Sequence, residues 1–283
     1  MGNKNSAVNV QNKSKIKITV LGSGTSTGIP TLGCKCSVCT SKIQKNKRLR
    51  SSIIITINNK RILIDASTDL RTQLLDNNID DIDGCIITHE HADHTHGIDD
   101  LRPFCFKKEK PIPVFASEVT SKILTNKFSY IFQRHILFKD KKVLGGGIPK
   151  LDLNEVSPGS NLILGEEFTF FSLPHGHHET LGFRVGKFAY IIDCNEVSDD
   201  IIDSLKDEQL ELLIIDCLRI KKHQTHLHLD LALEYAKRIG ATKTGLTHMS
   251  HDFEHEDFSQ MLCKNYGDSI FPLYDTQQFE LFY

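Results

Sequence analysis

The stretch GCIITHEHADHTHG, residues 84–97, joins an apolar run to a cluster of metal-ligand side chains. Residues 84–88 have the composition of a buried strand, and residues 89–94 follow the pattern His-x-His-x-Asp-His. From the His and Asp frequencies of this chain, that pattern would arise by chance in about three such chains per thousand. Imidazole and carboxylate together suit Zn²⁺, Mn²⁺ or Fe²⁺, so the stretch predicts a metal site rather than a solvated polar loop.

Further candidate ligands stand at the ends of three other apolar runs, because one hexapeptide cannot close two metal sites. His175 lies in the sequence PHGHH, Asp193 ends the apolar run 188–192, and His248 lies in the sequence THMSH. A single His or Asp at a strand end is usually structural. Three of them beside the hexapeptide are much harder to explain by coincidence, so we expect these side chains to meet.

Composition narrows the class of protein. Of 283 residues, 39% are hydrophobic and 25% charged, which excludes a disordered or collagen-like chain. The net charge of −2 provides no broad basic field for nucleic acid. No apolar stretch approaches the ~18–20 residues that span a bilayer. Because the N-terminus lacks a signal-peptide pattern and the cysteines do not form a secreted disulfide framework, we expect a cytoplasmic protein.

The chain divides into a polar tail and one folded domain. Residues 1–14 are rich in Asn, Ser and Lys and are predicted to be disordered. They also fit the pattern for myristoylation on Gly2, although an ordinary polar tail is the favoured interpretation, and one acyl chain would anchor only weakly. The folded domain is expected over residues 15–283.

Hydrophobic periodicity and turn residues predict an α/β domain with its chemistry at strand ends. In the helix expected over residues 68–76, Leu70, Leu74 and Leu75 are placed on one side. Two more helices are expected over residues 117–132 and 229–239. Strands are expected over residues 15–21, 52–57, 61–64, 84–88 and 211–216, within 162–173 and 181–193, and over 243–247.

These residues resemble the metallo-β-lactamase superfamily, over about residues 15–283. The resemblance implies an αββα sandwich with a binuclear site of two divalent metals, Zn or Mn, along one edge. It assigns His89, His91 and His175 to the first metal, with His177 as an alternative to His175. It assigns the second metal to Asp93, His94 and His248, with Asp193 bridging the two. Two such ions can hold a bridging hydroxide at neutral pH, which makes Asp93 a catalytic residue. Asp65, Asp99 and Asp100 are either orienting partners of the ligand histidines or surface carboxylates.

A second cluster, Cys-x-Cys-x-x-Cys, lies at Cys34, Cys36 and Cys39. Three thiols in six residues suit a structural Zn²⁺ that lacks one ligand, although three reduced spectator cysteines remain the alternative. The sequences around this cluster and at residues 94–104 and 247–252 are similar to the phosphonate-pathway cyclic phosphate phosphodiesterases. That resemblance implies His251 as the fourth ligand.

The sequence HQTHLH, residues 223–228, supplies the candidate general acid. Its spacing is similar to a histidine motif of the tRNA 3′-processing ribonucleases, in which a histidine outside the metal shell assists the leaving group. His226 fits that position best and His223 second; a surface histidine at a helix start is the alternative. The chain departs from those ribonucleases in HMSHD at its last ligand, so pre-tRNA cleavage is disfavoured.

We therefore expect a metal-dependent phosphodiesterase acting on a small-molecule or cyclic phosphate ester. Thioester hydrolysis and tRNA processing are alternatives within the same fold. A non-hydrolytic carrier resembling pyrroloquinoline quinone biosynthesis protein B is the alternative of another class. The seven filled ligand positions favour an enzyme, while the substrate, the metal and the oligomeric state stay open.

Overall fold

The computed structural model describes residues 15–133, 136 and 147–282. The predicted disorder of residues 1–14 and acylation of Gly2 lie outside this part of the chain. Two seven-stranded sheets pack face to face. The first has the strand order β14 (Gln278–Phe282), β1 (Lys15–Gly22), β2 (Ser52–Ile57), β3 (Lys60–Ile64), β4 (Gly84–Ile86), β5 (Ile112–Ala116) and β6 (Leu151–Glu155). The second has the order β13 (Ile270–Pro272), β12 (Lys243–Thr247), β11 (Leu212–Asp216), β10 (Phe188–Ile191), β9 (His178–Val185), β8 (Glu166–His175) and β7 (Gly159–Ile163).

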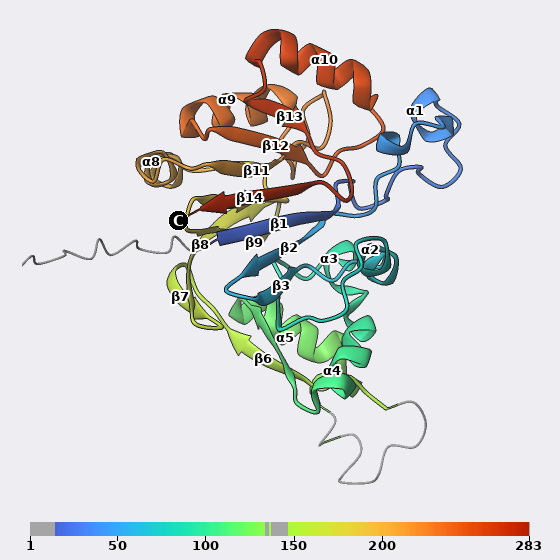
Figure 1. The fold of residues 1–283 in the computed structure, drawn as a ribbon, viewed down its shortest axis with the longest axis vertical. Helices are drawn as coiled ribbons and strands as arrows, with labels where there is room; N and C mark the ends of the chain where they lie inside the picture. The colour runs from blue at the N-terminus through green and yellow to red at the C-terminus, as the bar shows by residue number, and fades with distance from the viewer. Residues whose placement is uncertain (1–14, 134–135, 137–146, 283) are drawn as a thin grey trace, which may run out of the picture.

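Helices cover the outer face of each sheet (Figure 1). The first sheet packs against α2 (Leu70–Asp76), α4 (Arg102–Lys108) and α5 (Glu118–Lys127). The second packs against α8 (Asp199–Asp207), α9 (Leu229–Ile239) and α10 (His255–Tyr266). The short helical segments are α1 (Ser37–Thr40), η1 (Gln44–Asn46), α3 (Ala92–Thr95), η2 (Ile98–Leu101) and α6 (Ser129–Phe132).

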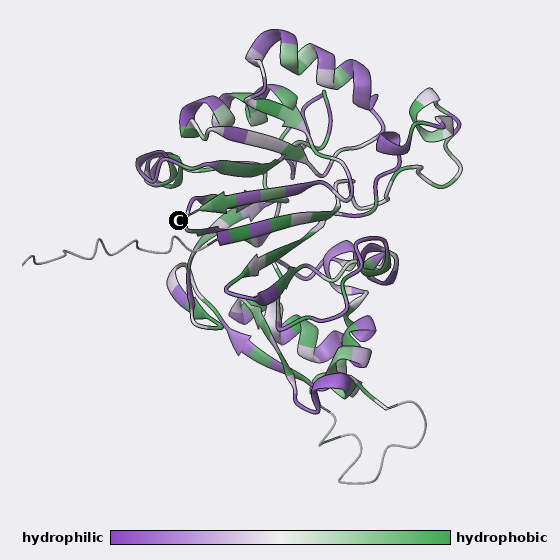
Figure 2. Ribbon diagram, viewed as in Figure 1, coloured by the Kyte–Doolittle hydropathy of each residue, from purple (hydrophilic) through white to green (hydrophobic). Residues whose placement is uncertain are grey.

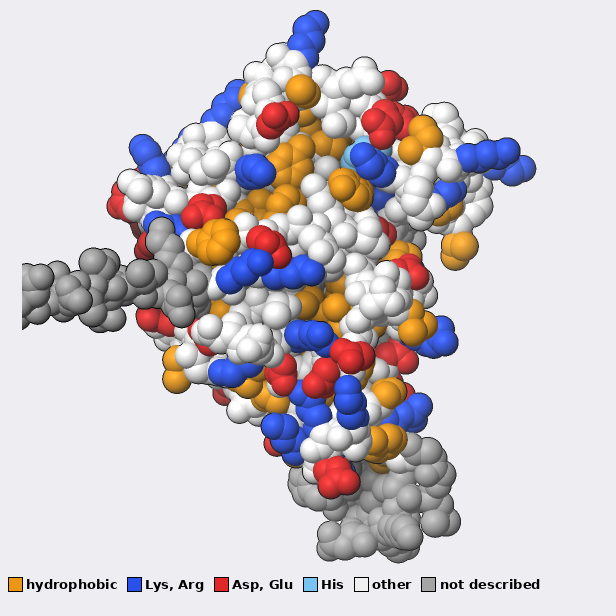
Figure 3. Space-filling view, in the orientation of Figure 1, with side chains coloured by type: hydrophobic (Ala, Val, Ile, Leu, Met, Phe, Trp, Pro, Cys, Tyr) orange, Lys and Arg blue, Asp and Glu red, His pale blue; other side chains and the backbone are white. Residues whose placement is uncertain are grey.

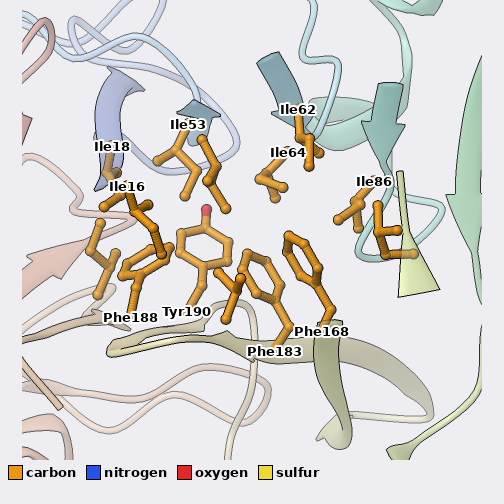
Figure 4. Close-up of a cluster of buried hydrophobic side chains, with 14 of the residues drawn as sticks. Ile16, Ile18, Ile53, Ile62, Ile64, Ile86, Phe168, Phe183, Phe188 and Tyr190 are labelled. Carbon is orange, nitrogen blue, oxygen red and sulfur yellow. The ribbon is translucent and has the colours of Figure 1, made fainter. Parts of the chain in front are cut away.

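Three apolar layers hold this αββα sandwich together because each central strand is apolar on both faces. In β2, Ile53 and Ile55 enter the layer between the sheets, whereas Ile54 packs under the helices of the first sheet. In β11, Ile214 faces the other sheet and Ile215 faces the helices. Figure 2 shows the apolar residues concentrated along the strands, and Figure 4 shows isoleucines of the first sheet facing Phe168, Phe183, Phe188 and Tyr190 of the second.

The expected fold class is confirmed, with local corrections. The helix predicted over residues 117–132 divides into α5 and α6 at Phe128, whose φ of −115° and ψ of 47° leave the helical region. Leu75 is 60% exposed and not beside buried Leu70 and Leu74, because it lies about 100° around the helix from Leu74. The strands β5, β6, β13 and β14 and the helices α8 and α10 were not among the predicted elements. Within the described residues, no helix is long and apolar enough to cross a membrane.

Candidate metal centre

The candidate ligands gather at one edge of the sandwich, where the parallel strands end. Asp193 follows β10 and His248 follows β12, while the 89–94 segment follows β4 of the other sheet. The carboxyl ends of parallel strands share one sheet edge, which is where α/β sheets place their sites. Asp193 and His248 have positive φ values of 48° and 59°. These left-handed residues turn the chain sharply and carry the strain that is common at functional sites.

The first ligand group consists of His89, His91 and His175. The Nε2 atom of His89 lies 3.0 Å from Nδ1 of His91, which lies 3.3 Å from Nε2 of His175. Ligand atoms around a tetrahedral ion with bonds of about 2.0–2.1 Å stand about 3.3 Å apart, so these nitrogens have ligand spacing. His177 is exposed and is not part of the group.

The second ligand group consists of four buried side chains, Asp93, His94, Asp193 and His248. The Nε2 atom of His94 lies 3.2 Å from Oδ2 of Asp93 and 3.3 Å from Oδ2 of Asp193. Oδ1 of Asp193 lies 3.1 Å from Nδ1 of His248, and Oδ2 lies 3.6 Å from Nε2 of His89. Asp193 therefore lies between the two groups, with one carboxylate oxygen near His248 and the other near His94 and His89.

Unpartnered polar atoms show that these residues fit divalent ions. Four buried atoms have no hydrogen-bond partner among the described residues: Oδ2 of Asp93, Nε2 of His94, Oδ1 of Asp193 and Nε2 of His248. A buried polar atom left without a partner costs free energy, and such atoms are rare in folded proteins. Bound cations would satisfy them, and the mixture of imidazole and carboxylate suits zinc or manganese.

The charges of the cluster favour the metal-binding protonation states of Asp193, His89, His175 and His248. Burial disfavours ionised Asp193, but His248 and His94 outweigh it and hold the pKa of this carboxyl well below its usual range. Burial lowers the pKa of His89, of His175 and of His248, which keeps these imidazoles neutral and able to bind a cation. His94 differs: burial disfavours its charged ring, yet the nearby carboxylates, Asp93 first, raise its pKa well above the usual range.

Outer partners orient the ligand rings. Nδ1 of His94 donates to Oδ2 of Asp65 at 2.7 Å, and Asp65 also accepts from the backbone N–H of Thr88 at 2.8 Å. Nδ1 of His175 donates to the carbonyl oxygen of Thr225 at 2.8 Å, and Nδ1 of His248 lies 3.2 Å from the hydroxyl of Ser51. Such contacts set which ring nitrogen is free to bind a metal.

Of the three carboxylates considered for this orienting role, only Asp65 contacts a candidate ligand. Asp99 accepts a hydrogen bond from Tyr130 and lies near Arg102, and Asp100 is exposed. For Asp99 and Asp100 the structure therefore favours the other alternative, surface carboxylates, because η2 carries both side chains toward the surface.

His226 lies against both ligand groups. Its ring stacks on that of His248, with centroids 4.9 Å apart, and meets the ring of His175 edge-on at 4.8 Å. Its Nδ1 donates to Oδ2 of buried Asp216 at 3.0 Å. Burial opposes the charged ring, but Asp216 outweighs it and raises the pKa of His226 to about 9. The ring of His223 lies on the far side of His226 from the ligand groups, with the two ring centroids 5.2 Å apart.

Asp216 was missed in the sequence, although the signal that marked Asp193 also marks this residue. It is the last residue of β11 and therefore a carboxylate at the end of an apolar strand. Ser51 carries no comparable signal, because 197 residues separate it from His248.

The cysteine cluster and His251 converge in a second group of ligand atoms. Nδ1 of His251 lies 3.4 Å from Sγ of Cys34 and 3.4 Å from Sγ of Cys39. Cys36 caps α1, and its sulfur accepts the backbone N–H of Cys39 at 3.4 Å. Three sulfurs and one nitrogen at this spacing match the donor set of a closed tetrahedral zinc site.

The segment from His248 to His251 contributes one side chain to each of the two clusters of ligand atoms. His248 points into the aspartate and histidine cluster, whereas His251 points into the cysteine cluster. Between them, the N–H of Met249 donates to the carbonyl oxygen of Ser23 at 3.0 Å, beside the cysteine loop. The guanidinium of buried Arg48 donates to the carbonyl oxygen of Phe253 at 2.9 Å. These contacts hold the segment where the two ends of the fold meet.

Comparison with known proteins gives one family match. The model described as the beta-lactamase superfamily domain matches residues 60–249. Among solved structures, a diphosphatase from the PhnP family is 34% identical, with a TM-score of 0.84 over 95% of this chain and 98% of that one. Zn²⁺-bound PqqB from Methylobacterium extorquens, at 17% identity and a TM-score of 0.73 over 94% of this chain and 100% of that one, shows the fold alone.

Two curated relatives match this chain only in part: one is a longer protein, and the other matches a shorter region of the chain. A protein named octanoyltransferase from Porphyromonas gingivalis strain W83 is 36% identical over 83% of this chain but only 46% of its own length. The coenzyme PQQ synthesis protein B of Klebsiella pneumoniae is 34% identical over 31% of this chain and 33% of its own. The chain thus spans less than half the length of the curated relatives it matches.

Proposed function

Because the chain belongs to the β-lactamase superfamily, we propose that it is a binuclear metal-dependent phosphodiesterase acting on a small-molecule or cyclic phosphate ester. The observation that carries this proposal is Asp193, which stands between two groups of ligand atoms with metal spacing. The 34% identity to a diphosphatase over nearly the whole chain supports phosphorus as the site of attack and adds phosphoanhydrides to the candidate substrates.

In this proposal the first ion is held by His89, His91 and His175, and the second by Asp93, His94 and His248, with Asp193 between them. The bound pair would lower the pKa of water and offset the negative charge that develops on the phosphoryl oxygens. Asp65, Thr225 and Ser51 contact the rings of His94, His175 and His248 and fix their orientation. The ligand side chains would therefore move little when the metals bind.

His226 is the proposed general acid. Its bond to Asp216 fixes the ring and stabilises the imidazolium form, while its contacts with His175 and His248 place it at the edge of the reaction centre. A proton from this ring would pass to the oxygen of the departing alcohol. The Asp216 carboxylate accepts the ring N–H throughout and acts only through His226.

We also propose a structural zinc at Cys34, Cys36, Cys39 and His251. The Cys36→Ser variant is expected to melt at a lower temperature and to lose one metal per chain, since metal-binding free energy is partly folding free energy. The catalytic pair should still turn over substrate at moderate temperature. Metal analysis and thermal melting check this, with Cys263→Ser as the control because Cys263 is exposed and outside the cluster. Unchanged metal content in Cys36→Ser would contradict the assignment.

Other functions have weaker support. Lys and Arg are interspersed with Asp and Glu on the face shown in Figure 3, which does not favour a nucleic-acid substrate. The octanoyltransferase name describes a protein of which this chain covers 46%. None of the eight cysteines, all of which are described in the structure, forms a disulfide bond, which supports a reducing, cytoplasmic setting.

A substrate panel tests the proposal. Purified protein is assayed with bis(p-nitrophenyl) phosphate, a cyclic nucleotide, a dinucleoside diphosphate, a β-lactam and a glutathione thioester, alongside metal analysis. Hydrolysis of phosphorus esters with about three metals per chain is expected. Preference for the thioester or the β-lactam would overturn the phosphodiesterase assignment, and about one metal per chain without turnover would indicate a carrier.

A further inference from the structure

The cysteine cluster lies at the periphery of the molecule. The loop that carries it, together with α1, projects beyond the edge of the two sheets in Figure 1. Cys34 and Cys36 are partly exposed, whereas Cys39 is only 4% exposed. A small oxidant in solution therefore has access to two of the three thiols without any unfolding of the sandwich.

Two of the thiols are arranged so that a disulfide can form between them. Cys36 and Cys39 are the first and last residues of a Cys-x-x-Cys sequence, and Sγ of Cys36 accepts the backbone N–H of Cys39 at 3.4 Å. A hydrogen bond to sulfur stabilises the thiolate, which is the form that reacts with oxidants. The ligand atoms of the cluster all lie within 4.8 Å of one another. A disulfide between these two residues thus requires only a local movement.

The cluster is joined to the catalytic centre through one short segment. His251 lies three residues after His248, and the guanidinium of buried Arg48 donates to the carbonyl oxygen of Ser250 between them at 3.4 Å. Ser51, three residues after Arg48, has its hydroxyl 3.2 Å from Nδ1 of His248. The anchoring of His251 in the cluster therefore helps to fix the position of the His248 ring.

We propose that Cys36 and Cys39 form a reversible redox switch, in which oxidation by a hydroperoxide releases the zinc and weakens the second catalytic metal site. The inference rests on the proposed structural zinc and goes beyond it, because it gives the cluster a regulatory role. Cellular thiols in a reducing compartment would reverse the oxidation.

The chemistry balances with hydrogen peroxide as the oxidant. The Cys36 thiolate attacks one peroxide oxygen, the O–O bond breaks, and the departing hydroxide takes up a proton and leaves as water. The Cys39 thiolate then attacks the sulfur of the resulting sulfenic acid, an S–S bond forms, and a second hydroxide is protonated and leaves as water. Two thiolates lose two electrons and one peroxide gains them. Cys34 and His251 remain, and two ligands are too few for a closed zinc site.

Zinc release and peptide mass test the switch directly. The zinc-loaded full chain is treated with hydrogen peroxide, and the released zinc is measured with a colorimetric chelator. We expect release of about one zinc per chain, and its recovery when a thiol reductant and zinc are added.

The pairing of the cysteines is read from tryptic peptides. Trypsin cuts after Lys35 and after Lys42. Cys36 and Cys39 therefore share one peptide, and Cys34 lies in another. After oxidation, the shared peptide is expected to be lighter by two hydrogen atoms and to resist thiol alkylation until it is reduced.

The link to the catalytic centre is measured as the affinity of the second catalytic metal, by competition with a chelator. Oxidised protein is expected to bind this metal about tenfold more weakly than reduced protein, since lost support of a metal ligand typically costs about 10–100-fold. The measurement does not depend on which substrate is cleaved. Cys263→Ser is the control variant and should respond to peroxide as the parent does, because Cys263 is exposed and outside the cluster.

The failures are distinguishable. If Cys36→Ser binds as much metal as the parent, the structural zinc is absent and the switch fails with it. If the parent holds this zinc but peroxide does not release it, or thiols cannot reverse the oxidation, the switch is overturned and the zinc site stands. A disulfide that includes Cys34 would overturn the pairing, and an unchanged affinity for the second catalytic metal would overturn the link to the catalytic centre.

Discussion

An Asp93→Ala variant is expected to lose phosphodiester hydrolysis while keeping its fold. Asp93 is one of the two carboxylates in the second ligand group, and its Oδ2 lies 3.2 Å from Nε2 of His94. Removing an outer partner of a metal ligand typically costs about 10–100-fold in affinity or activity, so loss of a direct ligand should cost more. The side chain belongs to none of the three apolar layers, which is why we expect the sandwich to survive.

Three measurements check this expectation together: turnover of bis(p-nitrophenyl) phosphate, metals bound per chain and the melting temperature. The expected variant has one metal fewer and turnover below about one hundredth of the parent's. Asp99→Ala is the matched control, since that aspartate contacts Tyr130 and Arg102 instead of the ligands. Parental turnover by an Asp93→Ala protein that lacks one metal would exclude a binuclear mechanism.

A His226→Ala variant should slow the reaction by about 10²–10⁴-fold on diesters with alkyl leaving groups, the usual range for losing a general acid. Such alkoxides are poor leaving groups and need a proton as the bond to phosphorus breaks. The p-nitrophenolate ion leaves without one, so p-nitrophenyl esters should lose little. This contrast separates proton donation from substrate binding or structural support.

The leaving-group dependence is measured by comparing kcat on an alkyl and a p-nitrophenyl diester for the parent and the variant. His223→Ala serves as the control, because the ring of His223 lies farther from the ligand groups than that of His226 and its hydrogen-bond partner among the described residues is Thr225 of the same loop. Asp216→Asn should weaken alkyl-ester turnover in the same direction through the orientation of His226. Equal losses on both ester types in His226→Ala would assign this histidine a different role.

Much of the candidate site could be predicted because metal ligands leave a local signal. The pattern His-x-His-x-Asp-His follows a buried strand, and the other candidate ligands carry ligand-type side chains at strand ends. Apolar runs and turn residues predicted an α/β domain, and the resemblance that these motifs carry implied its αββα architecture. Short strands such as β13 were missed because three residues offer no measurable periodicity.

Only the tertiary structure decided which residues support the ligands and what lies beside them. Asp65 reaches His94 across 29 residues, and Asp216 reaches His226 across ten, whereas Asp99 is closer in sequence to His94 and does not contact it. The cavity of about 530 Å³ beside Glu90 likewise assembles from loops that follow β5 and β6 and from the β8–β9 turn. Periodicity reports which face of an element is buried, but hydrogen-bond partners depend on which elements the packed sheets bring together. That pairing of distant segments is a property of the packed core, and no single stretch of the sequence contains it.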